Sequence, residues 1–200
     1  MTEVAPLTDR LLAGFAAQAY TTSTFQSGDV SATGFFWGEF DVIAFRGTQP
    51  DKIADWVRDL DIWPTWRRGL GMCHRGFVTG AESVLSDILH SFEGGRLVIT
   101  GHSLGGALAL AFAGLLVRSS HPVEAVVTFG SPRLGFGRLQ RLLSKTTVRQ
   151  YVDGNDLVPE VPRPYLHMRT PIAVGTPLPD PFDAHAVARY AALVPETVIG

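Results

Sequence analysis

Apolar positions along the chain follow two spacings, one typical of helices and one typical of buried strands. A 3.6-residue spacing predicts a capped helix through residues 11–19 and a second helix over residues 76–92. Short runs rich in β-branched residues predict buried strands at 97–99, 123–129 and 147–152. Strands that alternate with helices predict an α/β fold, in which helices cover both faces of a predominantly parallel sheet.

Three segments depart from this alternation. Residues 33–46 are rich in Phe, Trp, Val and Ile around a turn near Gly38, which predicts an antiparallel N-terminal strand pair. Apolar positions within 49–71 fit one helical face, so this segment is either a short helix packed on the core or a lid that lines a substrate site. Residues 159–181 hold seven of the 13 prolines, which predicts an irregular loop before a C-terminal helix headed by His185.

One serine joins a strand pattern to a helix pattern. Residues 105–117 are small or apolar on every side, and they predict a buried helix soon after the strand at 97–99. Between the two, Gly101-His-Ser103-Leu-Gly105 matches the nucleophile elbow, a strained turn that holds a serine hydroxyl at the edge of a sheet. Side chains at the two glycines would collide with the neighbouring strand and helix. Ser103 is therefore the candidate nucleophile.

Composition and charge fit one domain over residues 1–200, because an apolar fraction of 46% can build a sizeable core. A net charge of −2, without a basic stripe, gives no reason to expect nucleic acid as a partner. The single Cys73 cannot form an internal disulfide. No apolar stretch is long enough for a transmembrane segment, and Glu3 and Asp9 precede the first apolar run, the wrong order for a signal peptide. We expect a cytoplasmic protein, or one released without a recognisable signal peptide.

A serine nucleophile needs a base, and that base needs an acid to orient it. After a nucleophile elbow, the acid precedes the histidine in the chain, which leaves His167 and His185 as candidate bases. Asp153 and Asp156 both follow a strand end. Asp156 is favoured as the acid because apolar residues follow it and would strengthen its hydrogen bond, whereas Asp153 begins an Asp-Gly turn pair. The N–H of Leu104 is the first expected donor to an oxyanion.

A resemblance to a known family rests on six motifs. In chain order they are Phe45-Arg-Gly-Thr48, Asp55-Trp56, His74-Arg-Gly-Phe77, Gly101-His-Ser-Leu-Gly-Gly-Ala107, Thr128-Phe-Gly-Ser-Pro-Arg-Leu-Gly135 and Asn155-Asp-Leu-Val-Pro159. Together they resemble the class 3 lipases, a family of α/β-hydrolase triacylglycerol lipases, feruloyl esterases and related acylhydrolases. The resemblance implies Ser103 as nucleophile, Asp156 as acid and His185 as base. It also implies Thr48 as the second oxyanion donor and a structural role for His167.

The resemblance implies hydrolysis of carboxylic esters through an acyl-enzyme, without a metal or cofactor. Residues 49–52 are shorter and more polar than the lid of family members that act at oil surfaces, which favours an esterase or lipase for short-to-medium-chain or lipid-like acyl esters. The expected partners are a small-molecule ester or lipid substrate and, transiently, a lipid surface. Two alternatives stay open: a phospholipase or feruloyl-type esterase on the same triad, and a catalytically silent module that binds acyl ligands or proteins.

Overall fold

A computed structural model of the chain describes residues 4–60, 62–91 and 94–200. The helices are α1 (Asp9–Gln18), α2 (Ile53–Asp59), α3 (Arg75–Ser83), α4 (Leu85–His90), α5 (Leu104–Arg118), α6 (Gly137–Leu142), α7 (Pro181–Ala184) and α8 (Val187–Leu193), with short 3₁₀ turns η1 (Pro50–Lys52), η2 (Leu143–Lys145) and η3 (Val158–Glu160). The strands are β1 (Phe25–Ser27), β2 (Val30–Trp37), β3 (Phe40–Phe45), β4 (Pro64–Arg67), β5 (Gly71–His74), β6 (Arg96–His102), β7 (Ala125–Phe129), β8 (Thr147–Asp153) and β9 (Ile172–Val174).

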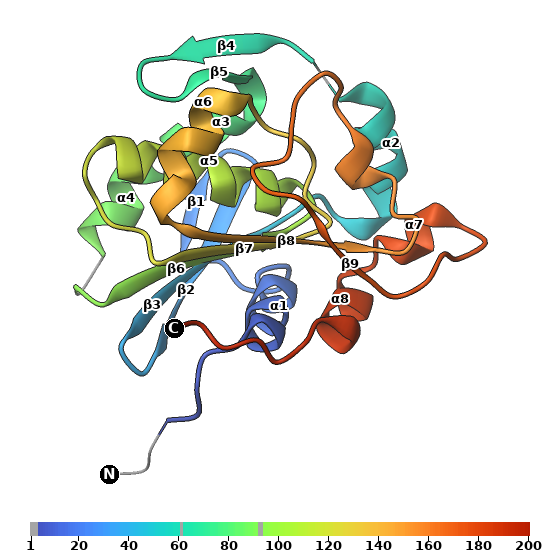
Figure 1. The fold of residues 1–200 in the computed structure, drawn as a ribbon, viewed down its shortest axis with the longest axis horizontal. Coiled ribbons are helices and arrows are strands. Elements are labelled where there is room, and N and C mark those ends of the chain that lie inside the picture. Colours follow the sequence, from blue (N-terminus) through green and yellow to red (C-terminus); the bar gives the residue numbers. More distant parts are fainter. Residues whose placement is uncertain (1–3, 61, 92–93) are drawn as a thin grey trace.

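The main sheet lies between two layers of helices (Figure 1). Within the described residues its strand order is β1-β2-β3-β6-β7-β8-β9. Strands β1 to β3 pair antiparallel, and β3 to β9 pair parallel in that order. The predicted α/β fold and its antiparallel N-terminal strands are therefore confirmed. Parallel strands end at the same edge, so the loops after β3, β6 and β8 bring Thr48, Ser103 and Asp156 to one end of the molecule.

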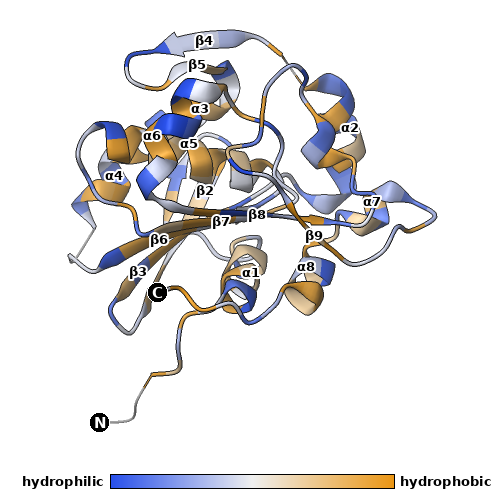
Figure 2. Ribbon diagram, viewed as in Figure 1, coloured by the Kyte–Doolittle hydropathy of each residue, from blue (hydrophilic) through white to orange (hydrophobic). Residues whose placement is uncertain are grey.

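Buried apolar residues form two clusters, and hydrophobic residues lie in the helices on both faces of the sheet (Figure 2). On one face, α5 is buried along most of its length, from Gly105 to Leu116, and packs against α3. On the other face, α1 and α8 pack against each other, with Leu12 and Tyr190 fully buried. Thr8 caps α1 by accepting a hydrogen bond from the backbone N–H of Leu11, as its sequence position predicts. The sheet is thus held rigidly between two apolar layers.

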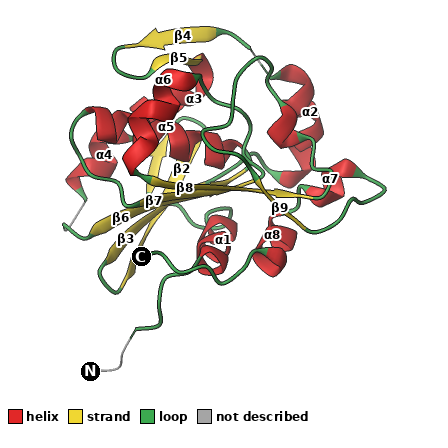
Figure 3. Cartoon of the chain, viewed as in Figure 1, coloured by secondary structure: helices red, strands yellow, loops and turns green. Residues whose placement is uncertain are grey.

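Several predicted boundaries change in the structure (Figure 3). The helix expected over 76–92 is two helices that meet at Val84, where φ is −111°, and residue 92 lies outside the described residues. The segment 49–71 contains α2 followed by the first part of the β4–β5 hairpin, which the helical spacing did not indicate. The proline-rich loop contains β9, a short edge strand that is largely exposed and so lacks the apolar pattern of a buried strand.

Candidate active site

Ser103 lies on a sharp turn between β6 and α5. Its backbone has φ 58° and ψ −134°, a conformation that costs a residue with a side chain on the order of 1–3 kcal/mol. The turn is held where its N–H donates to the carbonyl of Phe129 on the neighbouring strand, at 2.9 Å. The side chain is fully buried, and its Oγ has no hydrogen-bond partner among the described residues. The backbone turn, and not a hydrogen bond from Oγ to another described residue, thus sets the position of the hydroxyl.

Glycines allow the backbone to approach closely around this turn. A Cβ at Gly101 would overlap the backbone of Gly105, and a Cβ at Gly105 would overlap the carbonyl of Phe45. The collisions with the neighbouring helix and strand that the sequence predicts are therefore confirmed. Gly47 was not predicted in this role, although a Cβ there would lie 2.6 Å from the carbonyl oxygen of His102. The loop after β3 reaches the serine turn only because residue 47 is glycine.

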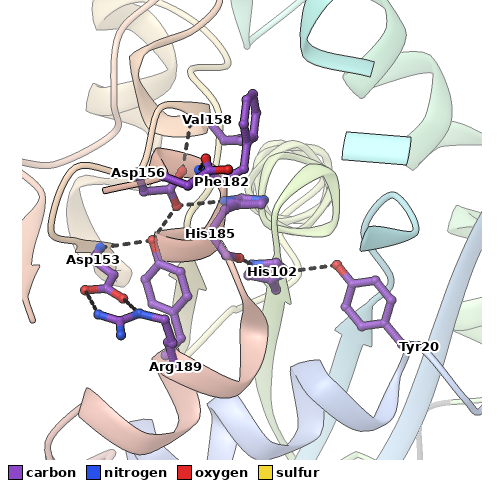
Figure 4. A network of polar contacts seen from close by, with 10 residues as sticks. Tyr20, His102, Asp153, Asp156, Val158, Phe182, His185 and Arg189 are labelled. Carbon is purple, nitrogen blue, oxygen red and sulfur yellow. Dashed lines mark hydrogen bonds and ion pairs between the residues drawn. The ribbon is translucent and has the colours of Figure 1, made fainter. Parts of the chain in front are cut away.

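Asp156 and His185 form a buried pair (Figure 4). His185 Nδ1 donates to Asp156 Oδ2 at 2.7 Å, and both side chains are almost completely removed from solvent. With the proton on Nδ1, Nε2 of the neutral ring carries the lone pair that can accept a proton. His185 Nε2 is also buried and, like Ser103 Oγ, has no hydrogen-bond partner among the described residues. Buried polar atoms without partners are rare and occur at catalytic sites.

Two further donors hold the Asp156 carboxylate. The hydroxyl of Tyr190 donates to Oδ2 at 2.7 Å, and the backbone N–H of Val158 donates to Oδ1 at 2.9 Å. Burial, followed by the nearby charge of Asp156, raises the pKa of Tyr190 well above its ordinary value, so the phenol keeps the proton that it donates. This contact of Tyr190 was not predicted from the sequence. The sequence shows only a tyrosine five residues after the histidine, a feature shared by tyrosines that merely pack in a core.

His102 supports the loop that carries His185. His102 Nε2 donates to the backbone carbonyl of His185 at 2.7 Å, so its Nδ1 accepts a hydrogen bond from the Tyr20 hydroxyl, also at 2.7 Å (Figure 4). Burial, and then the neighbouring His185, lowers the pKa of His102 well below its ordinary value and keeps the ring neutral. Chain order excludes His102 as the base. It does not predict the hydrogen bond from His102 to the His185 carbonyl. Through Tyr20, His102 links the turn that follows α1 to the backbone at His185.

The two alternative candidates lie in other contacts. The Asp153 carbonyl accepts a hydrogen bond from the N–H of Asp156, as in the predicted turn, while its buried carboxylate pairs with Arg189 at 2.6 Å. The ring of His167 lies 3.3 Å from the side-chain amide of Gln150, and burial lowers its pKa. Within the described residues, neither side chain makes a hydrogen bond to the Asp156–His185 pair.

Two cavities lie beside the serine turn. The first, of about 270 Å³, is lined by Thr48, His102 and His185 and by Ile53 of α2. The second, of about 280 Å³, is lined by Leu104, His74 and Phe77 and by Trp56 of α2. Thr48 and Leu104, the two predicted oxyanion donors, thus line different cavities. Helix α2 contributes to both cavities, in keeping with each interpretation of residues 49–71.

Residues 4–60, 62–91 and 94–200 hold no group of three or more His, Cys, Asp or Glu side chains arranged to bind a metal ion. No helix there combines the length and apolar character that crossing a bilayer requires.

The sheet, the strained serine turn and the order of strand-end residues define an α/β-hydrolase fold with serine at its nucleophile elbow. Residues 42–166 match the family Lipase (class 3), and the chain belongs to this family.

Individual relatives cover different shares of the chain. Triacylglycerol lipase OBL1 of Arabidopsis thaliana is 31% identical, over 60% of this chain and 34% of the relative. Secreted mono- and diacylglycerol lipase 1 of Fusarium solani is 33% identical, over 60% of this chain and 39% of the relative. The lipase of Rhizopus microsporus var. chinensis has a similar fold, with a TM-score of 0.65 and 23% identity, over 99% of this chain and 88% of that one. The chain thus matches 34% and 39% of the length of these two lipases from Arabidopsis thaliana and Fusarium solani.

Proposed function

We propose that the chain hydrolyses carboxylic esters of lipid-like or short-to-medium-chain acyl groups, acylglycerols included, through an acyl-enzyme on Ser103. The observation that carries the proposal is the buried hydrogen bond between Asp156 and His185, which leaves His185 Nε2 as an unpartnered acceptor. Acyl transfer needs a base that can take the proton of a serine hydroxyl, and Ser103 Oγ, on its strained turn, has no other partner among the described residues. Class 3 lipase relatives that act on tri-, di- and monoacylglycerols support the same substrate class.

Each residue has one role in the proposed reaction. His185 Nε2 takes the proton of Ser103 as Oγ bonds to the carbonyl carbon of the ester, and Asp156 stabilises the imidazolium. When the tetrahedral intermediate collapses, the carbon–oxygen bond to the alcohol breaks, and His185 gives the proton to the departing oxygen. A water molecule then attacks the acyl-enzyme with His185 again as base. The released acid and the regenerated serine complete the cycle.

The negative oxygen of the intermediate needs donors fixed in advance. The Leu104 N–H belongs to the first turn of α5, where backbone N–H groups have no partner within the helix. The Thr48 N–H is the second donor, and the missing side chain at Gly47 brings its loop against the serine turn. One such donor typically contributes about 3–4 kcal/mol to the transition state. Acyl and alcohol portions of the substrate would occupy the two cavities that flank Ser103.

A fluorophosphonate probe tests the nucleophile. We expect mass mapping of the labelled protein to place the probe on Ser103, and we expect Ser103→Ala to remove the label. A chain-length series of p-nitrophenyl esters, measured beside acylglycerol, phospholipid and feruloyl esters, then tests the substrate class. Folded protein that binds acyl ligands but neither hydrolyses these esters nor takes up the probe would be a silent binding module, and the proposal would be wrong.

A further inference from the structure

The β4–β5 hairpin carries large apolar side chains on its exposed surface. Trp63 is 64% exposed, Trp66 and Ile62 are each 58% exposed, and Met72 is 41% exposed. Trp66 and Met72 are directly opposite each other in the antiparallel pair, so their side chains share one face of the hairpin. Soluble proteins seldom gather exposed tryptophans in this way unless the surface contacts another apolar phase. We call this group of four residues the hairpin surface.

An apolar groove continues the hairpin surface onto its neighbours. The groove measures about 720 Å³, and Phe136, Pro164 and Tyr165 line it together with Trp66 and Met72. The Tyr165 hydroxyl donates to the carbonyl of Ile62 at 2.9 Å, which ties the proline-rich loop to the start of the hairpin. The groove is therefore built from three separate segments of the chain and faces outward. Arg138 also lines the groove, so its otherwise apolar wall carries one positive charge.

Cationic side chains surround the turn of this hairpin. Exposed Arg68 lies in the turn, Arg118 donates to the backbone carbonyl of Arg68, and Arg138 donates to the carbonyl of Gly69. In the part of the chain that the structure describes, none of these three guanidinium groups is in an ion pair. Residues 62–75 include no Asp or Glu. The chain has a net charge of −2 and no basic stripe in its sequence, so folding concentrates this positive charge from distant segments.

The hairpin surface is connected to the candidate active site. Tyr165 of the groove packs edge-on against the His74 ring, with 5.7 Å between their centroids. His74 in turn lines the cavity next to Leu104, together with Trp56 of α2. A surface that contacts the hairpin would therefore lie beside the cavity that the proposed function assigns to substrate.

We propose that the hairpin surface docks on a lipid surface that carries anionic headgroups. The tryptophan rings would lie at the boundary between headgroups and acyl chains, where an amphipathic indole is most stable. Arg68, Arg118 and Arg138 would meet the phosphate groups, and guanidinium groups bind phosphate with two parallel hydrogen bonds. The apolar groove would take up the acyl region that the rings displace. This docking goes beyond the proposed function, because it needs no chemistry at Ser103.

Vesicle binding tests the proposal on the full chain. Ser103→Ala protein, which leaves lipids intact, is mixed with vesicles of phosphatidylcholine alone or with about a third phosphatidylglycerol, and bound protein is measured by sedimentation. We expect binding to the anionic vesicles, a blue shift of tryptophan fluorescence, and weakening at high salt. Added Trp66→Ala or Arg68→Glu should each weaken binding about 10-fold or more.

Matched controls separate the hairpin surface from general effects. Phe36→Ala removes an aromatic side chain that is 67% exposed on β2, and Lys145→Glu makes the same charge reversal on exposed η2. Both should bind like the parent protein. Equal binding to neutral vesicles, equal binding by Arg68→Glu, or a Trp66-dependent dimer in place of vesicle binding would each overturn the proposal. Because Ser103→Ala is used throughout, loss of docking and loss of esterase activity are read in separate experiments.

Discussion

The buried polar residues around Ser103, here called the buried corner, differ from the exposed hairpin surface in how their side chains are held. In the corner, each polar contact fixes the next: Tyr190 holds Asp156, Asp156 orients His185, and His102 supports the backbone of His185. On the hairpin, Trp66 and Met72 lie opposite each other and are exposed to solvent. Side chains in a buried polar network depend on one another, whereas exposed contacts contribute separately and modestly. Substitutions in the buried corner should therefore have large, non-additive effects on turnover. Substitutions on the hairpin surface should have small, additive effects on the free energy of unfolding.

The largest expected effect comes from the base. His185→Ala should lower kcat for a soluble ester by about 10³-fold or more, because the serine loses its proton acceptor. His167→Ala removes a histidine that contacts Gln150 instead, and it should retain kcat within a few-fold. Steady-state rates on a p-nitrophenyl ester, with circular dichroism to confirm folding, measure both. If His167→Ala abolished turnover and His185→Ala did not, the assignment of the base would be wrong.

A smaller effect is expected one contact further from the serine. Tyr190→Phe keeps the buried ring but removes the hydroxyl that donates to Asp156 Oδ2. A lost hydrogen bond to a charged group is worth about 1.5–3 kcal/mol, so kcat should fall by about 10-fold or more while KM changes little.

The pH profile of kcat/KM separates a positioning role from a purely structural one. We expect its acidic limb to move in Tyr190→Phe, because the carboxylate that partners the base has lost a donor. Tyr151→Phe offers a control, since that hydroxyl donates to Asp9 elsewhere in the molecule and its limb should not move. A Tyr190→Phe enzyme with unchanged kcat and limb would show that Tyr190 only fills space.

The sequence predicts Ser103, Asp156 and His185 as the candidate residues of the buried corner because they belong to a short motif or follow a fixed order along the chain. The serine turn is one short motif, and the chain order of acid and histidine eliminates most candidates for both. The Asp156–His185 contact agrees with that prediction, while the catalytic roles of both residues stay predictions. The supporting contacts of Tyr20 and Tyr190 could not be predicted, because each joins residues at least 34 positions apart. No local pattern distinguishes such a tyrosine from one that only packs in the core.

Elements of the fold could be predicted where burial imposes a regular pattern of apolar residues along the sequence. Strands β6, β7 and β8 and helix α5 are buried, so their apolar runs reveal them. Strand β9 is three residues long and mostly exposed, and hairpin β4–β5 is half exposed, so neither shows the alternation of a core strand. The arginine cluster could not be predicted either, because Arg68, Arg118 and Arg138 come together only in the folded chain.

An intermediate effect is expected on stability as the pH falls. Burial lowers the pKa of His102 in the folded protein, while the unfolded chain binds a proton near the ordinary value of about 6.5. Below that pH the unfolded state binds more protons, so the free energy of unfolding decreases as pH falls. His102→Gln keeps a donor for the His185 carbonyl but cannot titrate. Between pH 7.5 and 5.5 the parent should lose about 1 kcal/mol more than this variant in urea unfolding; an equal loss would contradict a buried neutral His102.

The smallest effect is expected at the hairpin. Trp66→Ala removes a side chain that is more than half exposed, so it should change the free energy of unfolding by less than about 0.5 kcal/mol and leave turnover of a soluble ester unchanged. Leu70, in the same hairpin, is fully buried against the core, and Leu70→Ala should cost about 2–5 kcal/mol. Urea unfolding followed by circular dichroism compares the two. A large loss from Trp66→Ala would show that this tryptophan stabilises the fold, and its exposure would then need no docking partner to explain it.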